Sequence, residues 1–264
     1  MTSQPILTMY RGWLDQNLYV WSPYVTKLEA RLRFSGLSYK SAGGSPKSAP
    51  RGKIPYLDLT PAGNAGAVEQ LSDSTLIVKE LAARGMLKDL NDGLSKTEKA
   101  MDLALRALLE DKLGFYHSWE RWTQNYYTMR DHVMWPIPYF IRIFVGQLAY
   151  RNTVATLHGQ GTGRFSAEEI GEFRKEVWSA FSDLLLESKV KHGKNGKGED
   201  EPFWVLGGDA PTDIDAALFG FVMSALLCTA GPGSKADVKS LPVLGEYSKR
   251  IHAKYFPEYE NFPM

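Results

Sequence analysis

The chain has 264 residues, which suffice for one large domain or two small ones with an ample core. Its 44% hydrophobic and 23% charged residues are ordinary for a globular protein, and a net charge of +1 gives no electrostatic argument for nucleic acid or an anionic membrane. The single cysteine, Cys228, excludes a disulfide within these residues and fits a reducing compartment, so we expect a cytoplasmic protein.

No stretch of the sequence predicts a membrane-spanning helix. The first residues, MTSQPILTMYRGW, lack the basic start and continuous apolar core of a secretory signal. The longest apolar run, residues 216–230, is shorter than the roughly 20 residues that a bilayer requires, and Asp213 and Asp215 stand directly before it. We therefore expect this run to form a buried core helix and expect no membrane partner.

The first 85 or so residues predict the order strand, helix, strand, strand, strand, helix. PILTMYR favours a strand, residues 22–35 a helix, and LSYKSA a second strand. After a loop rich in Gly, Pro and Ser, KIPYLDL and AVEQL predict a hairpin around TPAGNAG. SDSTLIVKELAARG predicts a helix that Asp73 or Ser74 can cap and that Gly85 ends.

Pro55 lies inside a strand-like segment, where a trans proline would remove a hydrogen bond between strands. It fits at a sheet edge, at a bulge or in a cis turn. The cis turn would leave the N–H and C=O groups of Ile54 free to pair with a peptide-like ligand. The sequence leaves all three options open.

Residues 87–98 are polar and predict a linker, and everything from residue 99 onward is helical in character. Aromatic residues crowd the segment from 115 to 127. One amphipathic helix opens with a capping box from Ser166 to Glu169. The buried helix opens with Thr212 as cap and Asp215 in the reciprocal position. The fold class is therefore an α/β domain over residues 1–86 followed by an all-α domain over residues 99–264.

Four motifs in this order resemble the glutathione transferase superfamily. SPYVTKLEARLRFSGLSYK resembles the first helix of its serine-type members, GKIPYLDL its cis-proline segment, LSDSTLIVKEL its acid-serine motif, and LGGDAPTDIDAALFG the start of its central C-terminal helix. The extra GWLDQNLYVW before the Ser-Pro pair, the ERW-containing helix and YSKRIHAKYFPEY are similar to the failed axon connections and metaxin-like branch. The resemblance implies that residues 1–86 form a thioredoxin-like, glutathione-binding domain.

Ser22 stands where a helix can stabilise a thiolate. The thiolate is the nucleophilic form of a thiol whose ordinary pKa is roughly 8.5. A helix N-terminus favours an anion, and a hydroxyl that donates a hydrogen bond favours it further. Pro23 suits the first helical turn, so the residues alone also allow Ser22 to be a simple helix cap. The resemblance implies that Ser22 contacts the sulfur of glutathione. Tyr24 ranks second for this role and Tyr10 third.

The resemblance also implies how the rest of glutathione binds. Ile54, before Pro55, would pair its backbone with the cysteinyl part, and Asp73 with Ser74 would hold the γ-glutamyl end. Lys53 could approach the glycyl carboxylate or remain a solvated loop residue.

An apolar acceptor pocket is expected between the two domains. Aromatic residues at helical spacing are usually core, and this alternative stays open. The five histidines lack metal-ligand spacing and one cysteine cannot build a zinc cluster, so we expect no metal. The candidates for the acceptor pocket are Tyr10, Trp13, Tyr116, Trp119, Arg121 and Tyr126.

The resemblance implies a glutathione-dependent transferase that attacks an apolar, preferably aromatic electrophile, in detoxification or secondary metabolism. Ether cleavage or isomerisation would use the same thiolate, and bacterial β-etherases of this superfamily look similar at Ser-Pro-Tyr-Val. A non-catalytic adaptor of the failed axon connections or metaxin type, or a carrier of apolar ligands, is the alternative from another class. A homodimer is possible.

Overall fold

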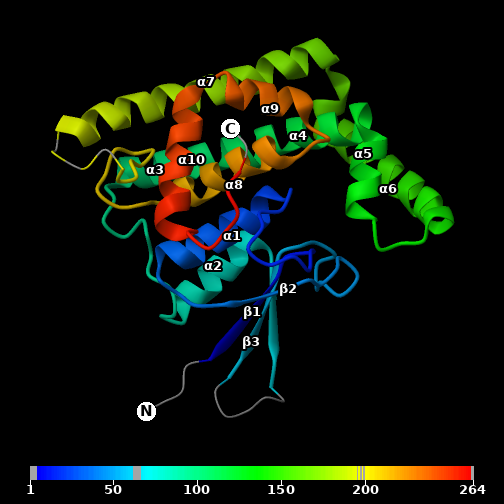
Figure 1. The fold of residues 1–264 in the computed structure, drawn as a ribbon, viewed down its shortest axis with the longest axis horizontal. Coiled ribbons are helices and arrows are strands. Elements are labelled where there is room, and N and C mark those ends of the chain that lie inside the picture. Colours follow the sequence, from blue (N-terminus) through cyan, green and yellow to red (C-terminus); the bar gives the residue numbers. More distant parts are fainter. Residues whose placement is uncertain (1–4, 62–66, 195, 197, 199, 263–264) are drawn as a thin grey trace.

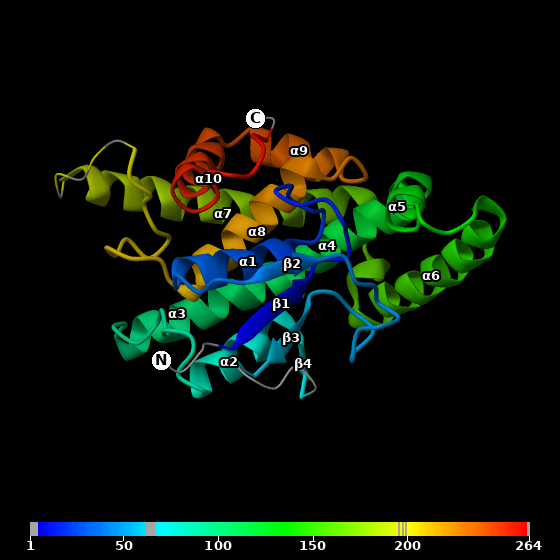
Figure 2. The same cartoon turned by 60° about the horizontal axis from the view of Figure 1, so that its bottom comes forward.

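The computed structural model describes residues 5–61, 67–194, 196, 198 and 200–262. Its first part is a four-stranded sheet in the order β2-β1-β3-β4 (Figure 2), in which β1 and β2 are parallel and the other neighbouring pairs antiparallel. Two helices lie between this sheet and the helical remainder (Figure 1). The elements are β1 (Ile6–Tyr10), α1 (Pro23–Phe34), β2 (Lys40–Ala42), β3 (Tyr56–Thr60), β4 (Glu69–Ser72) and α2 (Ser74–Ala83).

This order confirms the predicted succession of strands and helices, including the hairpin of β3 and β4. Part of the hairpin loop, residues 62–66, lies outside the described residues. Asp73, rather than Ser74, caps α2, because its carboxylate accepts hydrogen bonds from the N–H groups of Thr75 (3.0 Å) and Leu76 (3.1 Å). Gly85 follows the helix with φ of +68°, a conformation that suits glycine after a helix end.

The second part of the chain is helical, as expected. Its first helix begins at Lys96, capped by Ser95 and Glu98, so the linker is shorter than the predicted 87–98. A continuous helical stretch then alternates α-helix with two π-helical segments, which the sequence analysis did not predict. The elements are α3 (Lys96–Ala107), η1 (Leu108–Leu113), α4 (Gly114–Trp119), η2 (Glu120–Gln124), α5 (Tyr126–Val133), α6 (Tyr139–Gln160), η3 (Thr162–Arg164), α7 (Ala167–Lys194), α8 (Asp213–Leu227), α9 (Pro232–Lys239) and α10 (Pro242–Tyr255).

The centre of the helical part is α8, the predicted core helix. Every residue from Ile214 to Leu226 is buried. Within the described ranges, no single helix is long and apolar enough to cross a membrane. The pair α8 and α9 passes that length and composition test only together, across a bend of 117°.

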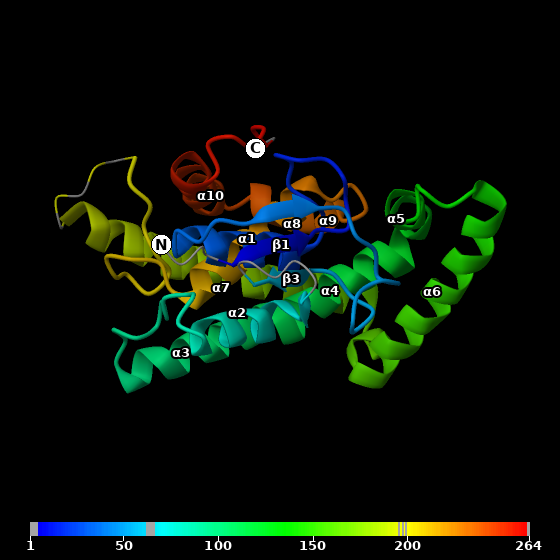
Figure 3. The same cartoon turned by 90° about the horizontal axis from the view of Figure 1, so that it is seen from below.

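The two parts of the chain meet where α8 crosses α1 (Figure 3). The contact is so close that a Cβ atom on Gly220 would lie 2.4 Å from the carbonyl oxygen of Pro23 and 2.9 Å from the backbone nitrogen of Lys27. Both of these are main-chain atoms, which cannot move aside as a flexible side chain could. Glycine at this position therefore sets where the start of α1 lies.

Replacing Gly220 by alanine should lower the free energy of unfolding by about 1–3 kcal/mol, because the new methyl group separates the two helices. Urea denaturation measures the change. The matched control is Gly171→Ala on α7, where an added Cβ meets no atom within 4 Å. That substitution should raise the free energy of unfolding by about 0.5–1 kcal/mol through helix propensity. Equal changes in the free energy of unfolding of Gly220→Ala and Gly171→Ala would contradict the close contact between α8 and α1.

Candidate functional site

Three segments meet at one edge of the sheet. The register pairs Tyr10 with Tyr56 and Tyr56 with Ser72, so the end of β1, the start of β3 and the end of β4 form one row. The chain that leaves β1 after Tyr10 leads to Ser22 at the start of α1. The Ile54–Pro55 peptide precedes the start of β3, and Asp73 with Ser74 follows the end of β4. Strand pairing therefore brings together residues that lie far apart in the sequence.

Ser22 begins α1 but does not cap it with its side chain. Its backbone is extended, Pro23 occupies the first helical turn, and the Ser22 hydroxyl makes no capping hydrogen bond. The simple cap that the sequence allowed is therefore not formed. The first N–H groups of a helix lack partners within the helix. Together with a hydroxyl beside them, they can donate hydrogen bonds to an anion. Ser22 is partly exposed.

The helical domain holds the residue before Ser22. Arg121 on η2 donates from Nη1 to the carbonyl oxygen of Trp21 (3.2 Å) and from Nη2 to the hydroxyl of Ser224 (2.9 Å). The Ser224 hydroxyl donates to the same Trp21 carbonyl oxygen. Arg121, predicted as a pocket residue, is buried, and its contacts favour a role in positioning the start of α1. Ser224 plays the same part and was not predicted.

The peptide bond between Ile54 and Pro55 is cis, the third of the options that the sequence left open. Ile54 is partly exposed and lies against the chain that leaves β1: a Cβ on Gly12 would come within 2.4 Å of the Ile54 side chain. Gly12 has φ of +82°, so glycine is required there for conformation as well as for space. Lys53 is exposed on the same loop.

Asp73 has an unusual backbone for a non-glycine residue, with φ of +72°. Both hydrogen bonds of its carboxylate to the first turn of α2 use the same oxygen, Oδ1. Ser74, the first residue of α2, is buried. Beside them, Lys27 on α1 donates to the Thr75 hydroxyl (2.9 Å) and to Glu110 (2.7 Å). This cation links the starts of α1 and α2 to the helical domain.

The hydroxyls of Tyr24 and Tyr10, which compete with Ser22 for the contact with sulfur, both have partners or close neighbours in the protein. Tyr24 packs edge-on against Phe221, its oxygen is directed at Gly114, and burial raises the pKa of Tyr24 to about 12. Tyr10 donates to Asp58 (2.8 Å) and stacks on Tyr56, and the hydrogen bond to Asp58 raises the pKa of Tyr10 to about 12. These contacts commit Tyr10 to the sheet, and the ranking of Ser22 before Tyr24 and Tyr10 stays a prediction.

An aromatic stack lies next to Ser22. The ring of His132 on α5 is stacked between Trp13 (centroids 4.5 Å apart) and Trp21 (3.4 Å), which joins the segment after β1 to the helical domain. Burial lowers the pKa of His132 to about 4, so the imidazole is neutral at physiological pH. The sequence analysis included Trp13 but missed Trp21 and His132. Their distance in sequence gave no signal that they would meet.

The segment that carries Trp13 and Trp21 is fixed from several sides. The Arg11 guanidinium donates to two backbone carbonyl oxygens within it and forms an ion pair with the fully buried Glu29 of α1 (3.0 Å). Tyr19 forms a hydrogen bond with His252 of α10 (2.8 Å). The extra residues before the Ser-Pro pair therefore belong to the packed structure.

The other predicted pocket residues lie deeper in the helical domain or farther along it. Tyr116 is buried in the main hydrophobic core and packs near Phe173, and Trp119 is partly buried against the same core. Tyr126 belongs to an aromatic group on α5 and α6 that includes Tyr127 and Tyr150. The structure places these three in packing contacts, and their role as pocket residues stays a prediction.

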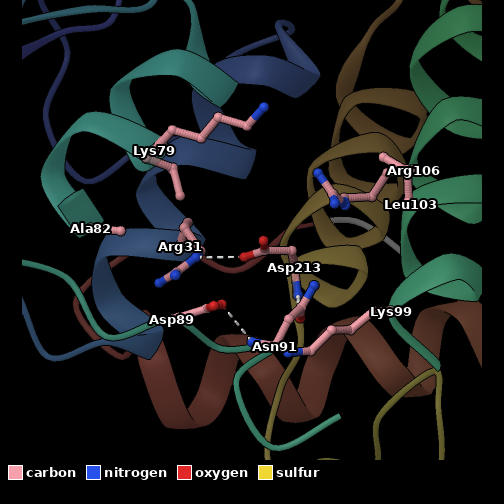
Figure 4. Close-up of a pocket in the computed structure, with 10 residues that line it drawn as sticks. Arg31, Lys79, Ala82, Asp89, Asn91, Lys99, Leu103, Arg106 and Asp213 are labelled. Atoms are coloured by element: carbon pink, nitrogen blue, oxygen red, sulfur yellow. Dashed lines mark hydrogen bonds and ion pairs between the residues drawn. The ribbon is translucent and has the colours of Figure 1, made fainter. Parts of the chain in front are cut away.

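A separate cavity of about 380 Å³ opens at the domain boundary between α2, α3 and the start of α8 (Figure 4). At its centre Arg31 of α1 forms an ion pair with Asp213 (2.7 Å). A smaller pocket that shares this pair reaches Lys27 and Thr75. Neither contains a predicted site residue. Across the described ranges, no group of three or more His, Cys, Asp or Glu side chains could hold a metal ion.

Comparison with known proteins gives matches of three kinds. The family of the glutathione S-transferase N-terminal domain matches residues 23–129. Failed axon connections of Drosophila melanogaster is 26% identical over 90% of this chain, and isoprene-epoxide–glutathione S-transferase of Rhodococcus sp. (strain AD45) is 28% identical over 89%. The aligned regions cover 55% of the first relative and 92% of the second, so the chain spans about half the length of Failed axon connections.

Solved structures share the whole arrangement. Glutathione transferase GSTFuA3 from Phanerochaete chrysosporium superposes with a TM-score of 0.55 over 99% of this chain and 100% of its own, at 18% identity. That likeness shows the fold, with its thioredoxin-like first part and helical second part. Fold, family match and relatives together make this chain similar to the glutathione transferase superfamily, with the family match confined to residues 23–129.

Proposed function

We propose that this chain is a glutathione-dependent transferase in which Ser22 stabilises the thiolate of glutathione. One observation carries the proposal: Ser22 begins α1 with a hydroxyl that makes no capping hydrogen bond, and Lys27 of the same helix donates to Thr75 (2.9 Å), directly after the Asp73–Ser74 pair. A hydroxyl and helix N–H groups favour a thiolate over a thiol, and the thiolate is the nucleophile. Two named relatives or neighbours are glutathione transferases, which supports the same reaction class.

The remaining residues at this edge match the other parts of a tripeptide. The backbone of Ile54 would pair with the cysteinyl part, because the pairing of β3 with both of its neighbours begins only at Tyr56. The Oδ2 oxygen of Asp73, which accepts neither of the two capping hydrogen bonds, would hold the ammonium of the γ-glutamyl end, and the first turn of α2 would hold its carboxylate. Lys53 would reach the glycyl carboxylate from its exposed loop.

The electrophile would enter beside the stack of Trp13, His132 and Trp21. Indole and imidazole faces suit an apolar or aromatic acceptor, and Trp21 directly precedes Ser22. We propose conjugation as the reaction, with ether cleavage and isomerisation as other outcomes of the same thiolate. One relative is named for isoprene epoxide, so a small epoxide and an aromatic halide are the first acceptors to assay.

Calorimetric titration with glutathione tests the proposal directly. We expect saturable binding at millimolar glutathione or below, and much weaker binding of the dipeptide cysteinylglycine, which lacks the γ-glutamyl end. The variant Ser74→Ala should reduce the difference in affinity between glutathione and cysteinylglycine. Absence of heat with millimolar glutathione would refute the transferase proposal and favour an adaptor.

The adaptor alternative rests on the similarity to Failed axon connections. In that case the fold would persist while the sheet edge served protein contacts. Homodimer formation and a cytoplasmic location stay predictions for both functions. Light scattering on the purified chain measures the first, and imaging of a tagged chain measures the second.

A further inference from the structure

Helix α6 presents an unusually apolar surface to solvent. The exposed fractions of Phe140, Phe144 and Leu148 are 80%, 73% and 66%. Tyr139 and Ile141 are also more than half exposed, as is Trp135 just before the helix. At about 100° of rotation per residue, the five helical positions span about 200° of the helix circumference. A helix that is apolar over so wide an arc normally has a covering on more than one side.

Only a narrow face of α6 contacts the rest of the protein near this end. A Cβ on Gly146 would lie within 2.8 Å of the side chains of Arg130 and Tyr126 on α5, so the two helices touch there. Arg142 turns back to bond the carbonyl oxygens of Trp135 and Ile137. Figures 1 and 3 show α5 and α6 together at one end of the molecule, away from the sheet. The apolar arc therefore faces outward.

The same region has few carboxylates. Residues 132–167 contain no Asp or Glu, whereas they include Arg142, Arg151 and Arg164. Arg142 forms an ion pair with Asp131 just before this stretch (3.6 Å), which leaves Arg151 and Arg164 as its basic contribution. Arg151 is exposed on α6 and has no ion-pair partner among the described residues. The whole chain has a net charge of +1, which does not reveal that this 36-residue stretch lacks acidic residues, since all 30 Asp and Glu residues lie outside it. A surface that is both apolar and basic is complementary to an anionic lipid headgroup layer.

We propose that α6 docks the protein on an anionic membrane surface, with residues 135–148 immersed among the headgroups. The apolar part of the helix, residues 139–148, is about 15 Å long, half the thickness of a hydrocarbon core, so it lies in the interface without crossing. Trp135 and Tyr139 are residue types enriched at that depth. A second copy fits less well, because it would bring together two stretches without carboxylates and would leave part of the arc uncovered. The proposal departs from the expectation of no membrane partner.

Sedimentation with lipid vesicles tests this docking on the full chain. Vesicles of equal parts phosphatidylserine and phosphatidylcholine should bind the protein more tightly than phosphatidylcholine alone, and added salt should weaken binding to the mixed vesicles. The double variant Phe140→Ser/Phe144→Ser should lower the partition constant about tenfold or more. Arg151→Gln should lower it about fivefold on the mixed vesicles and leave the neutral ones unchanged.

The matched control is Leu103→Ser/Val190→Ser, which removes two exposed apolar side chains from α3 and α7. It should bind vesicles as the unaltered protein does. Circular dichroism checks that both double variants are folded. Failure of the unaltered protein to bind mixed vesicles would overturn the proposal, and so would equal binding by the two double variants. A dimer seen by light scattering, lost only in Phe140→Ser/Phe144→Ser and without vesicle binding, would assign the face to a second copy.

Discussion

Ser22→Ala should lower turnover at neutral pH by about 10- to 150-fold, because a hydrogen bond to a charged group contributes about 1.5–3 kcal/mol. If Ser22 donates to the sulfur as we propose, the pKa of the bound thiol should lie below its usual value of roughly 8.5. Removal of the hydroxyl raises that pKa by about one to two units, so the rate profile moves to higher pH and part of the loss is recovered in alkali. Rates at saturating glutathione across the pH range measure the shift.

The structure indicates that Ser22→Ala should change catalysis without a large effect on stability. Because the Ser22 side chain makes no capping hydrogen bond, alanine removes no cap, and thermal unfolding should change little. Tyr24→Phe and Tyr10→Phe are the matched controls, since each removes one of the competing hydroxyls. Their rate profiles should keep the pH dependence of the unaltered protein. A shift in either control, with none in Ser22→Ala, would transfer the role to that tyrosine.

Local signals in the sequence predicted the scaffold of this site. The Ser-Pro pair marks a helix start, Asp73 offers a cap three residues before a run of apolar positions, and Pro55 interrupts a strand. Each of these features depends on neighbours in the chain. The predicted starts of α1 and α2 therefore match the structure, and the cis peptide at Pro55 was one of the options.

Contacts between distant segments were not predictable in the same way. Trp13 and Trp21 enclose His132 across more than 100 residues, and Arg121 reaches the carbonyl oxygen of Trp21 across 100. Such pairs arise only when two domains pack, and no spacing rule encodes them. The exposed face of α6 was missed for a related reason, since the average charge of the chain concealed a local absence of carboxylates.

Asp215→Ala should lower the free energy of unfolding by about 3–5 kcal/mol, a large part of the total for a typical domain. The carboxylate accepts hydrogen bonds from the N–H groups of Val205 and Thr212, from the Thr212 hydroxyl and from the Tyr247 hydroxyl, at 2.8–3.1 Å. All of these groups are buried, and alanine removes the partner of three donors, while the Tyr247 hydroxyl keeps the backbone carbonyl oxygen of residue 215 (3.1 Å). Urea denaturation measures the loss.

The pH dependence of this loss has a defined sign. Burial raises the pKa of Asp215 to about 6, above the value of about 3.9 in an unfolded chain. Between these values the folded protein retains a proton that the unfolded chain releases, so the contribution of Asp215 falls as the pH rises from about 4 to about 6. The difference between the unaltered protein and Asp215→Ala should therefore be larger at the lower end of that range.

Glu98→Ala is the matched control, because Glu98 has the same capping-box position at the start of α3 but is exposed. It should cost much less, since water can replace the lost partner. Equal losses would mean that the buried donors around Asp215 do not determine its effect. Asp215→Ala should also affect the candidate site, because it loosens the start of α8. The same helix contacts Pro23 through Gly220 and Trp21 through Ser224. A helix start that is fixed by buried hydrogen bonds thus determines where the Ser22 hydroxyl is held.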